Sequence, residues 1–369
     1  MILKEIQING FKNIAEASLT FSPKVNALLG NNGMGKSNLL DAIYFLSFCK
    51  SFSGMTDAQV IRRGDDFAMV RALYLRHGID EQLSLGITPG RRKSLKRQGK
   101  EYQRLSAHIG AFPLVMSSPQ DVDIIRGSSD ERRRLMDMVI SQTDPLYLDA
   151  LIRYGRALDQ RNRMLRDGIT DPSLFAAVEM QMDMAADTIH AARASWTERL
   201  TSIFSRYYSA ISGPGAAQVE RRYDSTLNAP GSTLPALLDA ARRRDEALRH
   251  TTVGPHRDDL DMLIDGMPMR RAASQGQCKT YAIALRLAQY EFLRDNVGMR
   301  PLLLLDDIFA KLDATRVERI MELVAGAGIG QIFITDTNRT HLDEIMRRTG
   351  SDYSLWHVDS GAFTPIHLD

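Results

Sequence analysis

Eight consecutive residues of the chain have the composition of a phosphate-binding loop. Residues 30–37 match the pattern of a glycine, any four residues, a glycine, a lysine and then serine or threonine. Glycines let backbone N–H groups approach a phosphate closely, and a helix that begins directly after them adds its positive end. We expect Lys36 to reach the β- and γ-phosphates of a nucleoside triphosphate and Ser37 to bind Mg²⁺. The candidate loop residues are Gly30, Asn31, Asn32, Gly33, Met34, Gly35, Lys36 and Ser37.

A triphosphate site also needs a carboxylate that holds the metal, at the end of a neighbouring strand. Residues 302–307 read as four leucines followed by two aspartates, which is typical of a buried strand that ends in acids. We expect Asp306 to hold Mg²⁺, directly or through water, and Asp307 to polarise the attacking water. A surface acid pair that only ends a strand is the alternative interpretation.

The third feature is Ser274-Gln275-Gly276-Gln277, immediately before an expected helix over residues 277–295. A serine and a glycine at a helix start can bind an anion. Such helix caps are common, however, and taken alone this one is as readily an ordinary cap.

The surrounding pattern predicts elements in the order that a phosphate loop requires. An apolar run at 25–29 predicts a strand before the loop, and helical spacing from Leu39 to Leu46 predicts a helix after it. Residues 66–116 are rich in strand patterns, and residues 129–206 are helical. We therefore expect an α/β sheet interrupted by a helical insertion. The other expected strands lie at 3–8, 17–21, 68–75, 82–87, 219–223, 258–264, 267–271, 302–305 and 331–335, and the other expected helices at 174–208, 237–249 and 315–324.

These motifs, in this order, resemble the ATP-binding-cassette ATPases of the chromosome-maintenance branch. Four strings narrow the resemblance to the RecF family of bacterial recombination mediators, over residues 1 to about 337. The resemblance implies an ABC-type P-loop ATPase head with an inserted, mainly helical lobe. The head would comprise 1–120 and 296–369, and the lobe that carries the serine–glycine signature would comprise 121–295. The four strings are 9–13, 128–134, 254–259 and 274–277, whereas residues 312–313 belong with the motifs that carry the wider resemblance.

The resemblance also implies roles for individual residues. Asp306 would assist Mg²⁺, and Asp307 stands where relatives place the catalytic acid, which is often a glutamate. The signature of one subunit would close over the γ-phosphate held by the other, so ATP would drive formation of a homodimer. Residues implied to bind ATP, besides the loop, are Lys12, Asn13, Asn38, Gln120, Ser274, Gln275 and Gly276.

The function implied by the resemblance is that of an ATP-dependent molecular switch on DNA. The closed dimer would grip duplex DNA and single-strand gap junctions in replication and in the repair of DNA damage, including the SOS response. With RecR and RecO it would promote loading of RecA, and a weak, DNA-dependent ATPase activity would reset it. Lys311 replaces a residue that is commonly acidic in the family, and Thr335-Asp336-Thr337 lacks the usual γ-phosphate-sensing histidine. We therefore expect slow hydrolysis.

A basic run is the best candidate for DNA contact. Residues 91–100 contain six positive charges and no acid, which suits sequence-independent binding to phosphates. A solvated, charged hairpin is the alternative interpretation. The arginines at 132–134 and 242–244 have acids nearby, which favours ion pairs, and a structural hydrogen-bonding role is favoured for His256. The tentative DNA-binding residues are Arg91, Arg92, Lys93, Lys96, Arg97 and Lys100.

The composition of the chain excludes several classes of protein. The 369 residues carry a net charge of +2, which excludes a basic coat over the whole molecule. Two cysteines cannot form a disulfide framework, and neither a signal peptide nor an apolar run of about 18 residues is recognisable. We expect a cytoplasmic protein associated with the nucleoid.

Three alternative functions share the phosphate loop. A transport ATPase would have a shorter chain and a compact helical insertion, and a long-armed structural maintenance protein would need hundreds of residues of heptads. A small-molecule kinase would not need the 274–277 signature and would transfer phosphate to an acceptor.

Overall fold

The computed structural model describes residues 1–309, 312–326, 328–337, 340, 343, 347 and 353–366, which fall into two compact units. The first unit consists of residues 1–121, 210–213 and 279–369, and the second of 122–209 and 214–278. The first unit therefore contains both the phosphate loop and the two aspartates from near the opposite end of the chain. Lys311 lies outside the described residues.

An antiparallel sheet of six strands, the outer sheet, forms one layer of the first unit, in the order β2-β1-β4-β5-β6-β7. Its strands alternate between buried and solvent-facing positions: Leu83, Leu85 and Ile87 of β5 are buried, whereas Gln82 is exposed. This alternation is typical of a sheet with one face on the core and one in water. The strands are β1(Ile2–Phe11), β2(Ile14–Thr20), β4(Ala68–Arg76), β5(Ile79–Ile87), β6(Ser94–Arg97) and β7(Lys100–Glu101).

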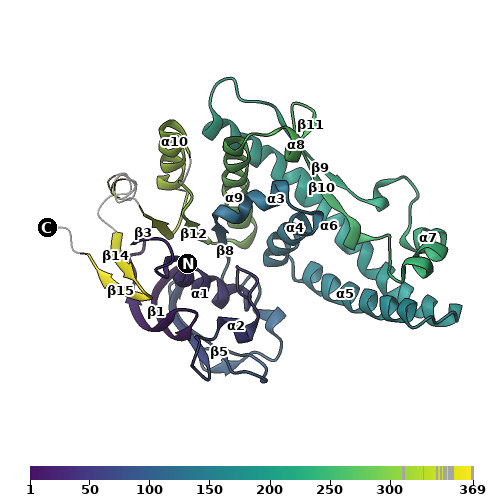
Figure 1. The fold of residues 1–369 in the computed structure, drawn as a ribbon, viewed down its shortest axis with the longest axis horizontal. Helices are drawn as coiled ribbons and strands as arrows, with labels where there is room; N and C mark the ends of the chain where they lie inside the picture. Colours follow the sequence, from purple (N-terminus) through teal and green to yellow (C-terminus); the bar gives the residue numbers. More distant parts are fainter. Residues whose placement is uncertain are drawn as a thin grey trace. The chain divides into compact units, whose positions relative to one another are not determined.

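The other sheet of the first unit, the central sheet, has the order β15-β14-β3-β13-β12-β8 (Figure 1). Five of its strands are parallel, and only β15 runs antiparallel to its neighbour. All five residues of β12 and of β13 are buried, as expected for strands covered on both faces. The strands are β3(Val25–Leu29), β8(Leu114–Ser117), β12(Leu302–Asp306), β13(Ile332–Asp336), β14(Tyr353–Asp359) and β15(Ala362–Pro365).

Helix α1(Lys36–Phe48) contacts strands of both sheets. Nearly all of its residues are buried, and this all-round burial explains why its sequence is apolar on every side. The helix holds its first turn, which follows the phosphate loop, at a fixed position against the central sheet. The other helices assigned wholly or mainly to this unit are α2(Asp57–Val60), α9(Gln275–Val297) and α10(Ala314–Ala325), with 3-10 turns at Leu105–His108 and Pro119–Asp121.

The second unit is mainly helical and contains a small antiparallel sheet in the order β11-β10-β9 (Figure 1). Two fully buried arginines fix its interior. The guanidinium of Arg161 lies 2.7 Å from Asp245, and that of Arg193 lies 2.9 Å from Asp258. Removing one member of such a pair costs about 3–5 kcal/mol, because a buried charge is left unpaired. The elements are α3(Val122–Arg126), α4(Ser129–Thr143), α5(Pro145–Arg166), α6(Pro172–Ser212), α7(Leu234–Leu248), α8(Met269–Ala272), β9(Val219–Asp224), β10(Asp259–Ile264) and β11(Met267–Pro268), with 3-10 turns at Thr226–Asn228 and Pro255–Arg257.

The structure differs from the sequence-based expectations at the end of the second unit. The strand expected over 267–271 has only two residues, and residues 269–272 form α8 instead. Pro268 lacks the N–H needed to extend the ladder. The division between the units falls after Cys278, earlier than the boundary expected at 295.

The earlier division follows from the contacts of α9 within the first unit. The guanidinium of Arg286 pairs with the buried carboxylate of Asp121 at 2.7 Å. The hydroxyl of Tyr290 accepts a hydrogen bond of 2.7 Å from the backbone N–H of Gly330. Most of α9 therefore packs with the sheets of the first unit.

Candidate functional site

The phosphate loop lies where β3 ends and α1 begins. The Lys36 ammonium, which is largely buried, donates to the carbonyls of Gly30 at 2.5 Å and Asn31 at 2.9 Å. Gly35 caps the helix with φ 112°, a conformation that L side chains rarely adopt. The loop thus has the backbone geometry that the glycine spacing predicted, with its lysine folded against it.

Two turns from distant parts of the chain hold the loop in place. Asn13, in the turn between β1 and β2, donates to the carbonyl of Met34 and accepts a 2.7 Å bond from Asn38. Gly361, in the turn between β14 and β15, donates its N–H to the same Met34 carbonyl at 2.7 Å. A Cβ on Gly35 would lie 2.8 Å from the Asn13 amide, so that glycine is required for close packing. The structure therefore brings Asn13 and Asn38 to the loop.

Lys12 has a different neighbour. Its ammonium lies 2.5 Å from the Asp41 carboxylate, in the middle of α1, and 3.0 Å from the hydroxyl of Ser53. Asp41 also accepts bonds from Ser51 at 2.6 Å and from the N–H of Phe52. The lysine expected beside the nucleotide is thus held by a buried ion pair that also anchors residues 51–53.

Below the loop, four residues form a continuous hydrogen-bonded network. The Ser37 hydroxyl donates to Oδ1 of Asp306 at 2.8 Å, and the Thr335 hydroxyl donates to the same oxygen at 2.7 Å. Thr335 Oγ1 in turn accepts from the backbone N–H of Asp307 at 3.0 Å. The chain end of β13 therefore orients both aspartates that follow the leucine run.

Thr335 is a candidate site residue that the sequence did not single out. It was noted only as part of a strand end that lacks a histidine, yet it is fully buried and bonds to both aspartates. A hydroxyl that ends an otherwise apolar strand was the available signal, because a buried polar group needs a partner. Asp307 itself has φ 46°, a left-handed conformation that is uncommon outside glycine and clusters at functional sites.

The charges at this edge are unequal. The carboxylates of Asp307, Asp306 and Asp336 all act on the ammonium of Lys36, and the ammonium of Lys279 also acts on Asp307. Burial lowers the pKa of Lys36, and the three carboxylates oppose this change. Burial raises the pKa of Asp307, and the negative charges of Asp336 and Asp306 raise it further. A divalent cation would relieve this repulsion.

The oxygen donors at this position fit Mg²⁺. Ser37 and Asp306 present a hydroxyl and a carboxylate within 2.8 Å of each other, and this hard cation prefers oxygen ligands of these two kinds. The remaining coordination positions of Mg²⁺ are usually filled by water and phosphate oxygens, which suits a site with only two protein ligands.

The 3-10 turn that contains Gln120 lies at the same sheet edge. It follows β8, which pairs in parallel with β12, so its start and Asp306 lie at neighbouring carboxyl ends. Gln120 is exposed, whereas the next residue, Asp121, is buried against Arg286. The turn is thus anchored by its aspartate and leaves the glutamine side chain accessible.

The signature residues belong to the second unit. The Ser274 hydroxyl accepts from the N–H of Gln277 at 3.2 Å, and the Gln277 side chain accepts from the N–H of Ser274 at 2.8 Å. This reciprocal pair is a capping box at the start of α9. Gln275 and Gly276 occupy the first turn, so the structure explains the string as a helix start two residues earlier than expected.

The six cations of the basic run divide into two groups. Lys93 donates to the Cys49 carbonyl at 2.5 Å and pairs with Asp57 at 2.8 Å. Arg97 pairs with the largely buried Glu81 at 2.7 Å, and Arg92 donates to the backbone carbonyl of Gln103. Exposed cations for which no ion pair is found within the described part of the chain are Arg91, Lys96 and Lys100.

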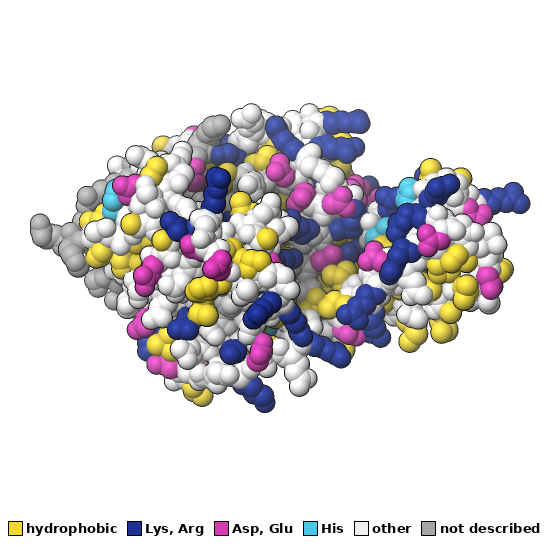
Figure 2. Space-filling model, turned by 60° about the horizontal axis from the view of Figure 1, so that its bottom comes forward, with side chains coloured by type: hydrophobic (Ala, Val, Ile, Leu, Met, Phe, Trp, Pro, Cys, Tyr) yellow, Lys and Arg dark blue, Asp and Glu magenta, His cyan; other side chains and the backbone are white. Residues whose placement is uncertain are grey.

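Arginines of the other two basic clusters also form internal ion pairs, but with acids distant in the sequence, apart from Arg133, which pairs with the nearby Asp130. Arg132 pairs with Asp259 at 2.5 Å, and Arg242 pairs with Glu179 at 3.1 Å. Figure 2 shows Lys and Arg side chains interspersed with Asp and Glu on the face in view, in keeping with the net charge of +2. Only local groups of cations are therefore available to an anionic partner there.

His256 has the structural role that its sequence context favoured. Its Nδ1 lies 2.8 Å from the Tyr154 hydroxyl, and its Nε2 lies 3.0 Å from the Thr251 carbonyl. Burial lowers the pKa of His256 to about 4. No group of residues suited to a metal centre is found among the described His, Cys, Asp and Glu. Within the described ranges, no helix is both long and apolar enough to cross a membrane.

Comparison with known proteins agrees with this geometry. The model of the RecF/RecN/SMC N-terminal domain matches residues 2–354. The chain is 48% identical to the DNA replication and repair protein RecF of Parabacteroides distasonis, over 99% of this chain and 100% of that protein. It is 49% identical to the RecF of Porphyromonas gingivalis, over 98% and 99%. A solved structure of the recombination mediator protein RecF with ATP, in the RecFOR pathway, superposes with a TM-score of 0.88 at 28% identity and covers 99% of this chain and 98% of that one.

Proposed function

The chain belongs to the RecF family, and from this premise we propose that it is an ATP-dependent DNA-binding protein of replication and recombinational repair. The observation that carries the proposal is the network joining Ser37, Asp306 and Thr335 beneath the phosphate loop. It gives the nucleotide site a ready set of oxygen ligands and connects that site to the end of a central strand. The site residues of the proposal are the loop, Asn13, Asn38, Asp306 and Asp307.

ATP would bind with its phosphates against the backbone of residues 30–36. Ser37 and Asp306 would hold Mg²⁺, which would neutralise phosphate charge when bound. Lys36 would leave the carbonyls that it now contacts and move to the β- and γ-phosphates. Gln120, exposed at the same sheet edge, is the candidate for a contact near the γ-phosphate.

Asp307 is the proposed base for hydrolysis. It would take a proton from the water that attacks the γ-phosphorus, while the bond from that phosphorus to the leaving ADP oxygen breaks. The pKa of Asp307 is raised and so lies closer to neutral pH, which suits a general base. The aspartate is one methylene shorter than the glutamate often found there, and 335–337 contains no histidine, so the proposed turnover is slow.

The signature is proposed to act between subunits. Ser274, Gln275 and Gly276 of one copy would contact the γ-phosphate bound to the other, so that ATP stabilises a homodimer. The capping box supports this role because it fixes the first turn of α9 and orients its N–H groups. Through the closed dimer the protein would grip duplex DNA near gap junctions and act with RecR and RecO before RecA.

Sedimentation velocity tests the dimer. We expect the wild-type chain to dimerise with ATP and Mg²⁺ and to stay monomeric with ADP. Ser274→Arg should remain monomeric with ATP, because its long cation fills the space over the γ-phosphate. The matched control is Ser205→Arg, an exposed position on α6 in the same unit. A Ser274→Arg chain that dimerises as readily as the control would contradict the proposed contact.

A further inference from the structure

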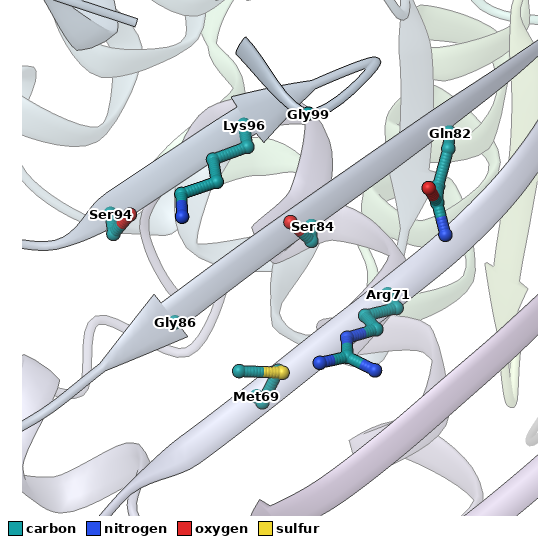
Figure 3. Close-up of a pocket in the computed structure, with 8 residues that line it drawn as sticks. All are labelled: Met69, Arg71, Gln82, Ser84, Gly86, Ser94, Lys96 and Gly99. Atoms are coloured by element: carbon teal, nitrogen blue, oxygen red, sulfur yellow. The ribbon is translucent and has the colours of Figure 1, made fainter. Parts of the chain in front are cut away.

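A hollow of about 290 Å³ lies on the solvent-facing side of the outer sheet (Figure 3). It is formed by strands β4, β5 and β6 and by the turn after β6. Its walls combine two cations with hydroxyl, amide and glycine positions, and only one residue is apolar. The lining residues are Met69, Arg71, Gln82, Ser84, Gly86, Ser94, Lys96 and Gly99.

The strand register places the cations on either side of one serine. Arg71 of β4 is directly opposite Ser84 of β5, and Ser84 is directly opposite Lys96 of β6. In the next row Met69 is opposite Gly86, and Gly86 is opposite Ser94. Figure 3 shows the two long side chains lying on the two sides of the central strand. Because neighbouring strands lie about 4.8 Å apart, the Cα atoms of Arg71 and Lys96 are about 10 Å apart, within reach of one group over Ser84.

The two cations are available to a partner. Both side chains are exposed, and in the described residues no ion pair is found for either. The arginines on the inner face of this sheet behave differently, because Arg76 and Arg97 both pair with Glu81.

Acids near the hollow are few. Glu101 of β7 is the cross-strand neighbour of Lys96, and Glu5 of β1 lies in a smaller adjoining hollow that Arg71 and Gln82 also line. The centre of the large hollow, at Ser84 and Gly86, carries no acid. Two cations and no acid therefore line the hollow itself.

The chemistry of the hollow fits a phosphodiester. Arginine, lysine and serine side chains are common contacts to DNA phosphates, and these contacts carry no sequence information. Gly86 has no side chain, so an oxygen can come close to the sheet at the centre of the hollow.

We propose that the Arg71–Ser84–Lys96 row binds a backbone phosphate of DNA. The inference rests on the proposed DNA-binding function and assigns a position to it. Arg71 was not among the candidates from the basic run, whereas Lys93 and Arg97 of that run are excluded by their internal pairs. The exposed Arg91 and Lys100, on either side of β6, extend the positive surface along the path of a strand of DNA. A polymer is favoured over a small anion because the cations continue beyond the hollow.

Fluorescence anisotropy with a labelled gapped duplex, in the presence of ATP and Mg²⁺ and over a salt series, tests the proposal. We expect Arg71→Gln combined with Lys96→Gln to weaken binding about tenfold at 0.1 M salt and to reduce the slope of log K against log salt by about 1. Ser84→Glu, which places an acid between the cations, should weaken binding at least as much. The matched control is Arg63→Gln combined with Lys24→Gln, an equal change of charge at exposed positions of the same unit.

Four further results decide between explanations. ATP affinity should be unchanged in the row variants, which separates this site from the nucleotide site. Row variants that bind DNA as tightly as the control, with the same salt slope, overturn the assignment while leaving DNA binding itself intact. A third result would be that inorganic phosphate shifts the NMR signals of the row while the row variants leave DNA affinity unchanged. In that case the site binds a small anion, and the assignment is also overturned. A wild-type chain that binds no DNA at any salt contradicts the proposed function instead.

Discussion

The carboxyl edge of the central sheet and the outer face of the antiparallel sheet both carry cations, yet the two regions are built differently. At the edge, Lys36 is largely buried, bonded to two carbonyls and acted on by the charges of three carboxylates. On the face, Arg71 and Lys96 are exposed above a serine and a glycine. A buried, fully bonded site fixes one ligand geometry, whereas exposed cations accept a ligand of variable sequence and depend strongly on salt. Under the two proposals above, the edge is the site for a defined nucleotide and the face is a surface for a polymer.

The largest expected effect is at the phosphate loop. Lys36→Met should reduce ATP hydrolysis by about a hundredfold or more. The substitution removes the positive charge that would stabilise the negative charge developing on the phosphate in the transition state. Single-turnover hydrolysis with radiolabelled ATP measures it, with Lys24→Met as the control at an exposed position. Binding of DNA without nucleotide should be the same in both variants. Hydrolysis at the wild-type rate in Lys36→Met would place the active nucleotide site elsewhere.

The next effect tests the positioning role of Thr335. Thr335→Val removes the hydroxyl at nearly constant volume and should lower kcat about tenfold and raise the Mg²⁺ concentration needed for half-maximal activity, while the KM for ATP changes little. Thr335→Ser keeps the hydroxyl and should restore most of the rate. Equal losses in the valine and serine variants would mean that the residue acts only through packing.

Lowering the pH should destabilise the folded state through one buried histidine in each unit. Burial lowers the pKa of His256, and that of His108, to about 4. An unfolded histidine has a pKa near 6.5, so between about pH 6.5 and pH 4 the unfolded chain binds more protons and the folded state loses stability as the pH falls. The His256 share of the unfolding free energy lost between pH 7 and pH 5 should be about 1–2 kcal/mol.

Urea unfolding of His256→Gln at both pH values tests this expectation. The variant should lose less stability between pH 7 and pH 5 than the wild type, and the remaining loss should come partly from His108. An unchanged loss would show that His256 is not buried as a neutral ring.

The smallest effects distinguish the two groups within the basic run. Arg97→Gln leaves Glu81 with a weaker partner and removes the contact of the guanidinium with the Phe112 ring, so the free energy of unfolding should fall by about 1–2 kcal/mol. Lys100→Gln should leave stability unchanged and weaken DNA binding a few-fold. Chemical denaturation and anisotropy on the same preparations measure both quantities. If the whole basic run contacted DNA, Arg97→Gln would instead weaken DNA binding more than Lys100→Gln does.

Local patterns predicted most of the fold. The glycine spacing, the apolar run at 25–29 and the four leucines at 302–305 each follow from contacts within a few residues, and the structure has the expected loop and strands there. The short strand at 267–268 departed from expectation because one proline ended the ladder. A hydrophobic pattern over a few residues does not show that one backbone N–H, that of Pro268, is missing from the ladder.

Long-range partners were harder to predict. The pairs Arg286–Asp121 and Arg97–Glu81 join residues that are distant in sequence or lie on different strands, and no local spacing indicates them. The partners of Thr335 were not predictable from local spacing either, because they lie at the end of β12 and directly after it, almost thirty residues earlier. Charge counts treated the cations of the basic run as equal, whereas burial on one face of a strand made some of them structural.

The central claim is that ATP at the phosphate loop controls the grip on DNA. The most direct measurement is the affinity for a gapped duplex with ATP and Mg²⁺, with ADP, and without nucleotide, in the wild type and in Ser274→Arg. We expect tight binding by the wild type only with ATP, and no ATP-dependent gain in Ser274→Arg. Equal DNA affinity under all three nucleotide conditions, or an undiminished gain in Ser274→Arg, would contradict the claim.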